Sequence, residues 1–174
     1  MIYFDASSTT PVRKEVLETF CQVTESFFGN PNSLHELGRE SKKLMNEATK
    51  QVAESLGVKK EEVIFTSSAS EANNMAIKGL FAAYPKRCKT IITTKLEHSS
   101  ILETVLHLDP SIKVKYVKVD ENGHIILEDL QRLLEEGALL VSIHHVNSEI
   151  GIIQNIKDIG SLIKEYPLTF FHVD

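Results

Sequence analysis

The chain has 174 residues, about the size of one globular domain, and a core of that size needs no disulfide or metal to stabilise it. Its 42% hydrophobic and 25% charged residues argue against a disordered chain or a coiled coil. A net charge of −5 disfavours nucleic acid as a partner. The lack of any apolar run near the roughly 18 residues of a membrane span disfavours a membrane.

The cysteine content and the first residues bear on the compartment. The two cysteines, Cys21 and Cys88, suit a reducing environment better than a disulfide framework. The opening residues, MIYFDASSTTP, lack the basic and apolar segments of a signal peptide. We therefore expect a cytoplasmic protein.

The first third of the chain is predicted to be helical. Thr10 places a capping hydroxyl before Pro11, which predicts a helix that begins there and ends near Gly29. Turn-forming residues follow, and a long amphipathic helix is expected from about Glu36 to Leu56.

From residue 62 onward, short apolar runs alternate with helical patterns. This alternation predicts right-handed crossovers and a mainly parallel sheet, and therefore an α/β fold. The predicted strands are 62–66, 89–94, 114–119 (at a sheet edge), 138–146 and 168–174, and the helices between them cover about 70–84, 101–106, 126–137 and 156–163.

Ligands of a parallel sheet bind beyond the carboxyl ends of its strands, where helix N-termini also point. The segment SSASE, residues 67–71, follows the first predicted strand, and its Ser68 and Glu71 have capping-box spacing. Free N–H groups and the helix dipole favour an anion such as phosphate at this place. An ordinary helix cap has the same pattern.

Polar side chains also follow the later strands. His98 comes after the second predicted strand, Asn147 after the fourth, and Asp174 after the last. A lone histidine is more often a surface residue, and a carboxylate such as Asp174 beside an apolar strand needs a positive partner. The adjacent His144 and His145 face opposite sides of a strand, so we expect no metal site there.

These strand ends together predict a polar, phosphorylated cofactor. The sequence contains neither the glycine motif of dinucleotide-binding folds nor that of P-loop proteins, so those two classes are disfavoured.

Six segments in register carry a resemblance to a known family: YFDASSTTPV, FGNPNSLH, IFTSSASEANNMAIKG, IITTKLEHSSILET, VSIHHVNSEIGIIQ and FHVD. Over essentially its whole length the chain resembles the cysteine desulfurases, pyridoxal-phosphate enzymes of the class V aminotransferase group. For residues 13–174 the resemblance implies the first part of the fold type I large domain, an incomplete, mainly parallel sheet flanked by helices. It also implies that residues 1–12 form an N-terminal arm that packs with a small domain, and that the strand at 62–66 lacks a neighbour.

The resemblance assigns a role to each candidate residue. Ala69 and Ser70 match the positions that bind the cofactor phosphate, and Asn147 matches the residue near the phenolic oxygen. His98 matches the imidazole that stacks on the pyridine ring and assists proton transfer, which makes it the catalytic candidate. Asp174 matches the carboxylate that pairs with the protonated pyridine nitrogen, and this nitrogen would be its positive partner.

The chain departs from the family pattern in two ways. Ser68 and Ser70 stand where glycine and threonine are common; the Ser70 hydroxyl keeps the phosphate contact, whereas Ser68 is incompatible with a backbone of positive φ. In the family, the lysine that holds the cofactor covalently and the cysteine that accepts sulfur lie downstream of the Asp174 position, and neither has a match here. We therefore predict that these 174 residues alone are inactive and bind pyridoxal phosphate weakly or not at all.

The implied activity of the parent protein is conversion of L-cysteine to L-alanine, with a persulfide sulfur passed to acceptors for iron–sulfur clusters or tRNA thiolation. L-cysteine, a sulfur-acceptor protein and a second copy of the chain in a homodimer are the expected partners. Two alternatives stay open: a selenocysteine lyase or other class V relative, and a non-catalytic fragment that binds a phosphate ligand or a partner subunit. A reading frame that continues past Asp174 favours the enzymes, and a natural stop there favours the fragment.

Overall fold

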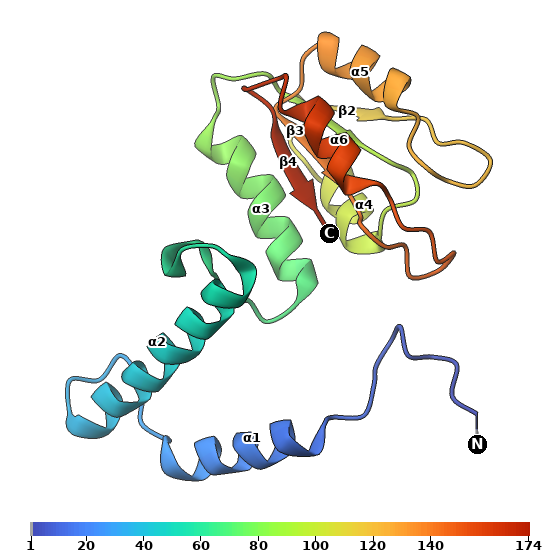
Figure 1. The fold of residues 1–174 in the computed structure, drawn as a ribbon. Coiled ribbons are helices and arrows are strands. Elements are labelled where there is room, and N and C mark those ends of the chain that lie inside the picture. The colour runs from blue at the N-terminus through green and yellow to red at the C-terminus, as the bar shows by residue number, and fades with distance from the viewer. Residues whose placement is uncertain (1) are drawn as a thin grey trace. The chain divides into compact units, whose positions relative to one another are not determined.

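The computed structural model describes residues 2–174, which divide into two compact units with the boundary in the sequence between Phe65 and Thr66 (Figure 1). The first unit contains α1 (Lys14–Ser26), α2 (Glu36–Leu56) and a short 3-10 helix, η1 (Lys60–Glu62). The second unit contains the sheet and the candidate site. No helix among residues 2–174 combines the length and the apolarity needed to cross a membrane.

The first unit agrees with the predicted helices except at one end. Helix α2 has the predicted bounds, and it stops at Gly57, whose φ of 66° is the left-handed conformation that favours glycine at a helix end. The prediction that α1 begins at Pro11 is wrong, because the helix starts at Lys14 with Arg13 as its N-cap. A capping hydroxyl contributes only about 1 kcal/mol to the stability of a helix. Since no residue of α1 is buried, packing does not add stability to a helix that begins earlier.

The second unit alternates helices and strands as predicted. Its elements in chain order are α3 (Ala69–Ala83), β1 (Thr90–Thr93), α4 (Ser99–Leu106), β2 (Lys113–Tyr116), α5 (Leu127–Glu135), β3 (Leu140–Ile143), α6 (Ile156–Ile163) and β4 (Phe170–Val173). The four strands are all parallel in the order β2-β1-β3-β4, which confirms the α/β class and the edge position of the 114–119 strand.

The strand predicted at 62–66 is not a strand in the structure. Residues 63–66 belong to no helix or strand, no strand of the described chain pairs with them, and Ile64 and Phe65 are exposed. An extended apolar segment becomes a strand only where a neighbour supplies ladder hydrogen bonds. The segment therefore lies outside the four-stranded sheet of the described chain.

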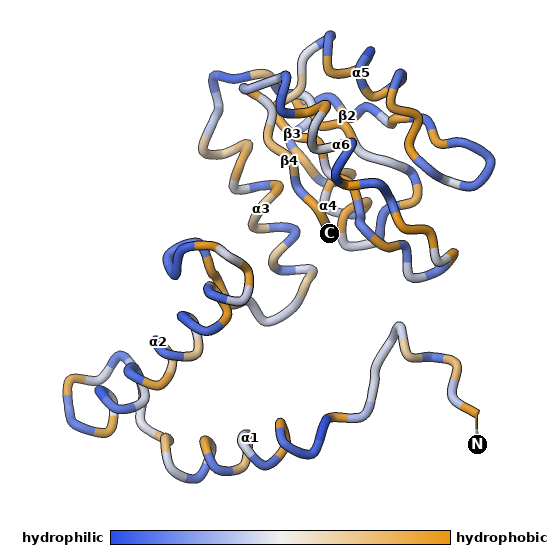
Figure 2. Tube along the Cα trace, in the orientation of Figure 1, coloured by the Kyte–Doolittle hydropathy of each residue, from blue (hydrophilic) through white to orange (hydrophobic). Residues whose placement is uncertain are grey.

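Helices cover both faces of the sheet (Figure 1). One apolar cluster joins Ile92 and Val141 to α5 and α6, and the other joins Ile91 and Leu140 to α3 and α4. The adjacent Ile91 and Ile92 are both fully buried because side chains alternate along a strand and each face has its own cover. All four residues of β1 and all four of β3 are accordingly buried, and the apolar residues of these strands lie at the centre of this unit (Figure 2).

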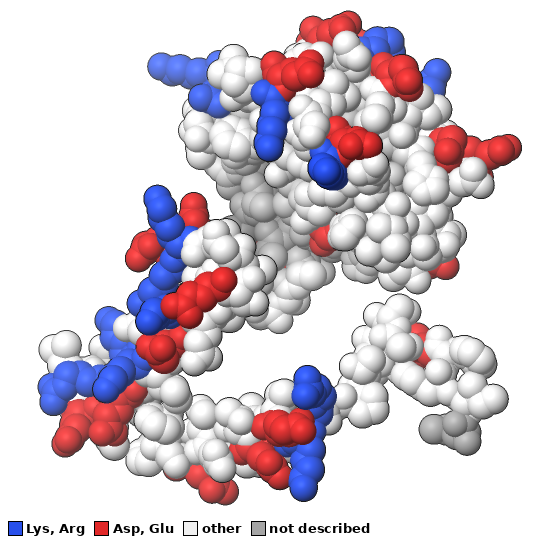
Figure 3. Space-filling view, viewed as in Figure 1, with Lys and Arg blue, Asp and Glu red and all other residues white. Residues whose placement is uncertain are grey.

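Charged side chains are spread over the outer surface. On the visible face, basic and acidic side chains are mixed along the helices, and neither sign forms a continuous field (Figure 3). This mixture agrees with the scattered lysines of the sequence.

The strand order places a topological switch point between β1 and β3. From β1 the chain crosses through α4 to β2 on one side, and from β3 it crosses through α6 to β4 on the other. The two crossover helices therefore lie on opposite faces and leave a crevice beyond the carboxyl ends of β1 and β3. Any small-molecule site of this sheet is expected there.

Candidate functional site

A pocket of about 270 Å³ lies beyond the carboxyl ends of β1, β3 and β4. Four of the five predicted site residues line it, namely Ala69, His98, Asn147 and Asp174. Ser70, the fifth, lines the adjoining groove between α3 and α4. The structure therefore brings the predicted residues to one end of the sheet, with Ser70 at its margin.

The N-terminus of α3 reaches the pocket through Ala69. Ser68 is the N-cap, and its hydroxyl accepts a hydrogen bond from the Glu71 N–H at 3.2 Å. Glu71 in turn accepts from the N–H and the hydroxyl of Ser67, at 2.6 and 2.7 Å, and these bonds lower the pKa of its carboxyl. The first N–H groups of the helix, including those of Ala69 and Ser70, have no carbonyl partner within the helix and face an anion favourably.

The backbone conformation at position 68 does not require glycine. Its φ of −164° is extended backbone that any residue adopts, and no residue other than glycine has a positive φ among the described residues. The serine in place of glycine is therefore compatible with the loop that precedes α3.

His98 is held by the start of the helix that follows it. It is the N-cap of α4, and its Nδ1 accepts the Ser100 N–H at 3.1 Å and lies 2.8 Å from the Ser100 hydroxyl. The ring is otherwise exposed at the pocket wall. Its Nδ1 edge is fixed, and its Nε2 edge is left for a ligand.

Asn147 stands at the start of the loop after β3, and most of its amide is committed to that loop. Its Oδ1 accepts from the N–H groups of Glu149 and Ile150, at 2.9 and 3.0 Å. Its Nδ2 donates to the carbonyl of Leu96 at 2.7 Å, which ties this loop to the end of β1. An amide nitrogen carries two hydrogens, so one remains for a ligand in the pocket.

Asp174 follows β4, and one of its two carboxylate oxygens accepts a hydrogen bond within the chain. Its Oδ1 accepts from Nδ2 of Asn73 at 3.1 Å, and its backbone carbonyl accepts from the His145 N–H at 2.8 Å. No lysine or arginine lines this pocket in the described chain, although Asp174, Glu97 and Glu149 do. Among the described residues, the lining of this pocket therefore offers Asp174 no lysine or arginine as a positive partner.

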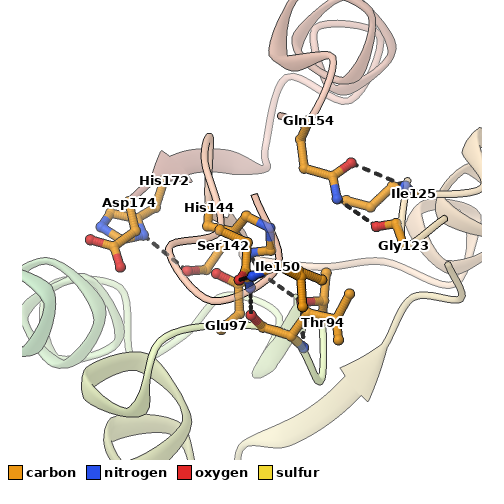
Figure 4. A network of polar contacts seen from close by, with 12 residues as sticks. Thr94, Glu97, Gly123, Ile125, Ser142, His144, Ile150, Gln154, His172 and Asp174 are labelled. Carbon is orange, nitrogen blue, oxygen red and sulfur yellow. Dashed lines mark hydrogen bonds and ion pairs between the residues drawn. The ribbon is translucent and has the colours of Figure 1, made fainter. Parts of the chain in front are cut away.

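The structure adds a buried pair that sequence reasoning did not find. His144 and Glu97 are 3% and 5% exposed, and Nδ1 of His144 lies 3.0 Å from Oε1 of Glu97 (Figure 4). The same oxygen accepts the Thr94 hydroxyl at 2.8 Å. Oε2 of Glu97 and Nε2 of His144 are buried without a hydrogen-bond partner in the described chain. The prediction that His144 and His145 face opposite sides is confirmed, since His145 is exposed.

A second buried contact fixes the loop that carries Asn147. Gln154 is 2% exposed, and its amide accepts from the Ile125 N–H at 3.1 Å and donates to the Gly123 carbonyl at 2.8 Å (Figure 4). Its own N–H donates to the carbonyl of His145 at 2.8 Å. The loop is therefore braced against the neighbouring turn, and this holds one wall of the pocket in place.

His172 lies on β4 behind the pocket, and its environment makes stability depend on pH. Its Nδ1 lies 2.9 Å from the Ser142 hydroxyl (Figure 4). Burial lowers the pKa of His172 below its ordinary 6.5, and the charges of Asp174 and Glu97 oppose this shift without reversing it. The neutral ring is thus the form that the folded chain prefers.

We expect His172→Gln to weaken the dependence of stability on pH. Because the folded pKa of His172 is depressed, its contribution is complete above the unfolded pKa of 6.5 and is lost as the pH falls through the folded pKa. The difference in melting temperature, variant minus wild type, should therefore increase as the pH is lowered from about 8 to about 5. A difference that is the same at both pH values would contradict this assignment.

Comparisons with known proteins agree with this geometry. Residues 2–174 match the family model described as aminotransferase class-V. The chain is 41% identical over 174 residues to cysteine desulfurase IscS of Dictyoglomus turgidum, a match that covers 99% of this chain and 44% of that protein. The chain therefore spans less than half the length of this curated relative.

Solved structures show the same fold. A NifS-like protein superposes with a TM-score of 0.94 at 42% identity, over 99% of this chain and 48% of the other. A protein described as SspA in complex with cysteine superposes with a TM-score of 0.90 at 34% identity, over 99% of this chain and 50% of the other. The resemblance to cysteine desulfurases and the predicted fold are confirmed by these matches, and the chain belongs to the class V aminotransferase family.

Proposed function

We propose that this chain supplies the pyridoxal-phosphate pocket of a cysteine desulfurase. One observation carries the proposal: a helix N-terminus, an imidazole, an amide N–H and a carboxylate converge on one pocket that no lysine or arginine of the described residues lines. This donor set fits a ligand with a phosphate, a flat ring and a protonated ring nitrogen. The similarity to proteins named cysteine desulfurase supports the same assignment.

Each group has a distinct task in this proposal. The N-terminus of α3, through Ala69 and Ser70, binds the phosphate dianion with N–H groups and the helix dipole. Asp174 keeps a proton on the ring nitrogen by pairing with it, and Asn147 donates its remaining N–H to the phenolic oxygen. His98 presents its ring to one face of the cofactor and its Nε2 edge to the substrate.

The proposed substrate is L-cysteine, and the product is L-alanine. Pyridoxal phosphate, when bound, supplies an electron-withdrawing ring for the amino acid's α-carbon. His98 would carry the proton that moves at the substrate, since its ring is exposed at the pocket wall with its Nε2 edge left for a ligand, whereas the ring of His144 is buried against Glu97. The sulfur would leave to a thiolate outside these 174 residues and pass from there to an acceptor protein.

The chain by itself is proposed to bind the cofactor only weakly and not to turn over cysteine. No lysine lines the pocket in the described residues, so the covalent bond that retains pyridoxal phosphate is not available from this wall. The cysteines Cys21 and Cys88 do not line it either. Binding would then depend on the phosphate, ring-nitrogen and stacking contacts alone.

The test is a titration of the chain with pyridoxamine 5′-phosphate, followed by the fluorescence of the ligand. This ligand keeps the ring nitrogen and the phosphate but has no aldehyde, so surface lysines do not capture it. We expect saturable binding, and weaker binding of pyridoxamine, which lacks the phosphate. Equal binding of the two ligands, or no binding of either, would overturn the proposal. Release of alanine from cysteine by the purified chain would contradict its predicted inactivity.

The other functions left open by the sequence make different predictions. A non-catalytic domain that binds phosphate ligands would retain inorganic phosphate as tightly as pyridoxamine 5′-phosphate. A selenocysteine lyase or another class V relative would bind the cofactor equally well, so cofactor binding does not separate these enzymes. Cysteine and selenocysteine must be compared as substrates in a protein that also contains the family's lysine and cysteine. The carboxylate at Asp174 favours a ligand with a cationic ring over a bare phosphate.

A further inference from the structure

The amide of Asn73 lies between two candidate site residues that are far apart in the sequence. Asn73 is in α3 and is 3% exposed. Its Nδ2 donates both hydrogens, one to the Ser100 hydroxyl at 2.9 Å and one to Oδ1 of Asp174 at 3.1 Å. Ser100 in turn contacts His98, so one amide connects the imidazole to the carboxylate.

These bonds determine which nitrogen of His98 carries the proton. The Ser100 hydroxyl accepts from Asn73, which leaves its own hydrogen to be donated to Nδ1 of His98, 2.8 Å away. The Ser100 N–H also points to Nδ1, at 3.1 Å. Nδ1 must therefore be an unprotonated acceptor, and the proton of the neutral ring lies on Nε2, the edge that is left for a ligand.

The same amide also orients Asp174. Because Oδ1 accepts from Asn73, the carboxylate is held with Oδ2 available for a cation in the pocket. Asparagine is an unfavourable residue inside a helix, since its side chain competes for backbone hydrogen bonds. At Asn73 the amide instead makes two bonds to other elements, and a buried amide without such partners would be strongly destabilising.

We infer that Asn73, acting with Ser100, is a positioning residue that sets the tautomer of His98 and the orientation of Asp174 together. This inference rests on the proposed function, because it concerns the same pocket. Asn73 does not line the pocket, so its effect on a ligand is transmitted through the other two residues.

The first experiment measures the tautomer in the chain without any ligand. Long-range ¹H–¹⁵N NMR spectra of the ¹⁵N-histidine-labelled chain separate the two neutral forms, and a His98→Gln sample identifies the His98 signals. We expect the Nε2–H form in the wild type and a larger share of the Nδ1–H form in Asn73→Leu and in Ser100→Ala. Asn74→Leu is the matched control, because the Asn74 amide bonds only the Ser70 carbonyl within its own helix.

The second experiment measures affinity for pyridoxamine 5′-phosphate. Asn73→Leu is expected to weaken binding by about 2- to 10-fold, the size of a typical net hydrogen-bond contribution, because its effect reaches the ligand only through Asp174 and His98, and Asn74→Leu is expected to leave binding unchanged. A wild-type His98 in the Nδ1–H form, or spectra of Asn73→Leu and Ser100→Ala identical to the wild type, would overturn the inference. Failure of the wild type to bind the ligand would overturn the proposed function instead, and the tautomer spectra would still decide the role of Asn73.

Discussion

Glu97→Leu is expected to lower the free energy of unfolding by about 3–5 kcal/mol, because it leaves His144 buried without its partner. The two side chains are almost completely buried and 3.0 Å apart, so neither can turn to water when the other is removed. The total free energy of unfolding of a domain is only about 5–15 kcal/mol, so such a loss is a large part of it. Urea unfolding followed by circular dichroism measures the change.

His144→Leu and the double variant complete the test of the buried pair. His144→Leu is expected to cost a similar amount, whereas the double variant should be more stable than either single variant, since a buried pair can be exchanged for apolar residues at little cost. His145→Leu is the matched control: this exposed neighbour makes only backbone hydrogen bonds. If the losses of the two single variants add up to the loss of the double variant within about 0.5 kcal/mol, Glu97 and His144 are not coupled.

The fold was largely predictable because it depends on patterns that are local in sequence. The alternation of apolar runs with helical periods predicted the parallel sheet, and Gly57 marked the end of α2 at the residue where it stops. The predictions that failed depended on distant partners. The segment 62–66 has a strand-like sequence, but strand formation needs a neighbouring backbone, and the start of α1 depends on packing that a capping signal does not supply.

The pocket itself was only partly predictable, for the same reason. Ala69, His98, Asn147 and Asp174 could be chosen because each follows a strand or begins a helix, and such places meet at one edge of a parallel sheet. Asn73 lies inside a helix, where no sequence signal separates a bridging amide from a surface one.

The buried pair and the brace behind the pocket were missed in the same way. Glu97 and His144 come from different strand ends, 47 residues apart, and Gln154 bonds a turn 29 residues before it. Alternation along the predicted strand did place His144 on the side opposite His145, but an acidic residue at the adjoining strand end was the one signal for its partner.

The carboxylate of Asp174 should control affinity for the cofactor more than any other single group in the pocket. Asp174→Asn keeps an oxygen that can accept from Asn73 but removes the negative charge that faces the ligand. A hydrogen bond to a charged group contributes about 1.5–3 kcal/mol, so affinity for pyridoxamine 5′-phosphate should fall by roughly 10- to 100-fold. Fluorescence titration of the two proteins measures the change.

Two controls identify the ring nitrogen as the group that Asp174 recognises. Glu165→Gln makes the same change of charge outside the pocket and should leave affinity unaltered. A ligand in which carbon replaces the ring nitrogen should bind the wild type and Asp174→Asn equally, since it offers no proton to the carboxylate. If this analogue loses as much affinity on substitution as the natural ring does, Asp174 acts on the ligand through the general field of the pocket. The pairing with a pyridinium nitrogen would then have to be abandoned, and with it the chemical reason for the carboxylate at the end of β4.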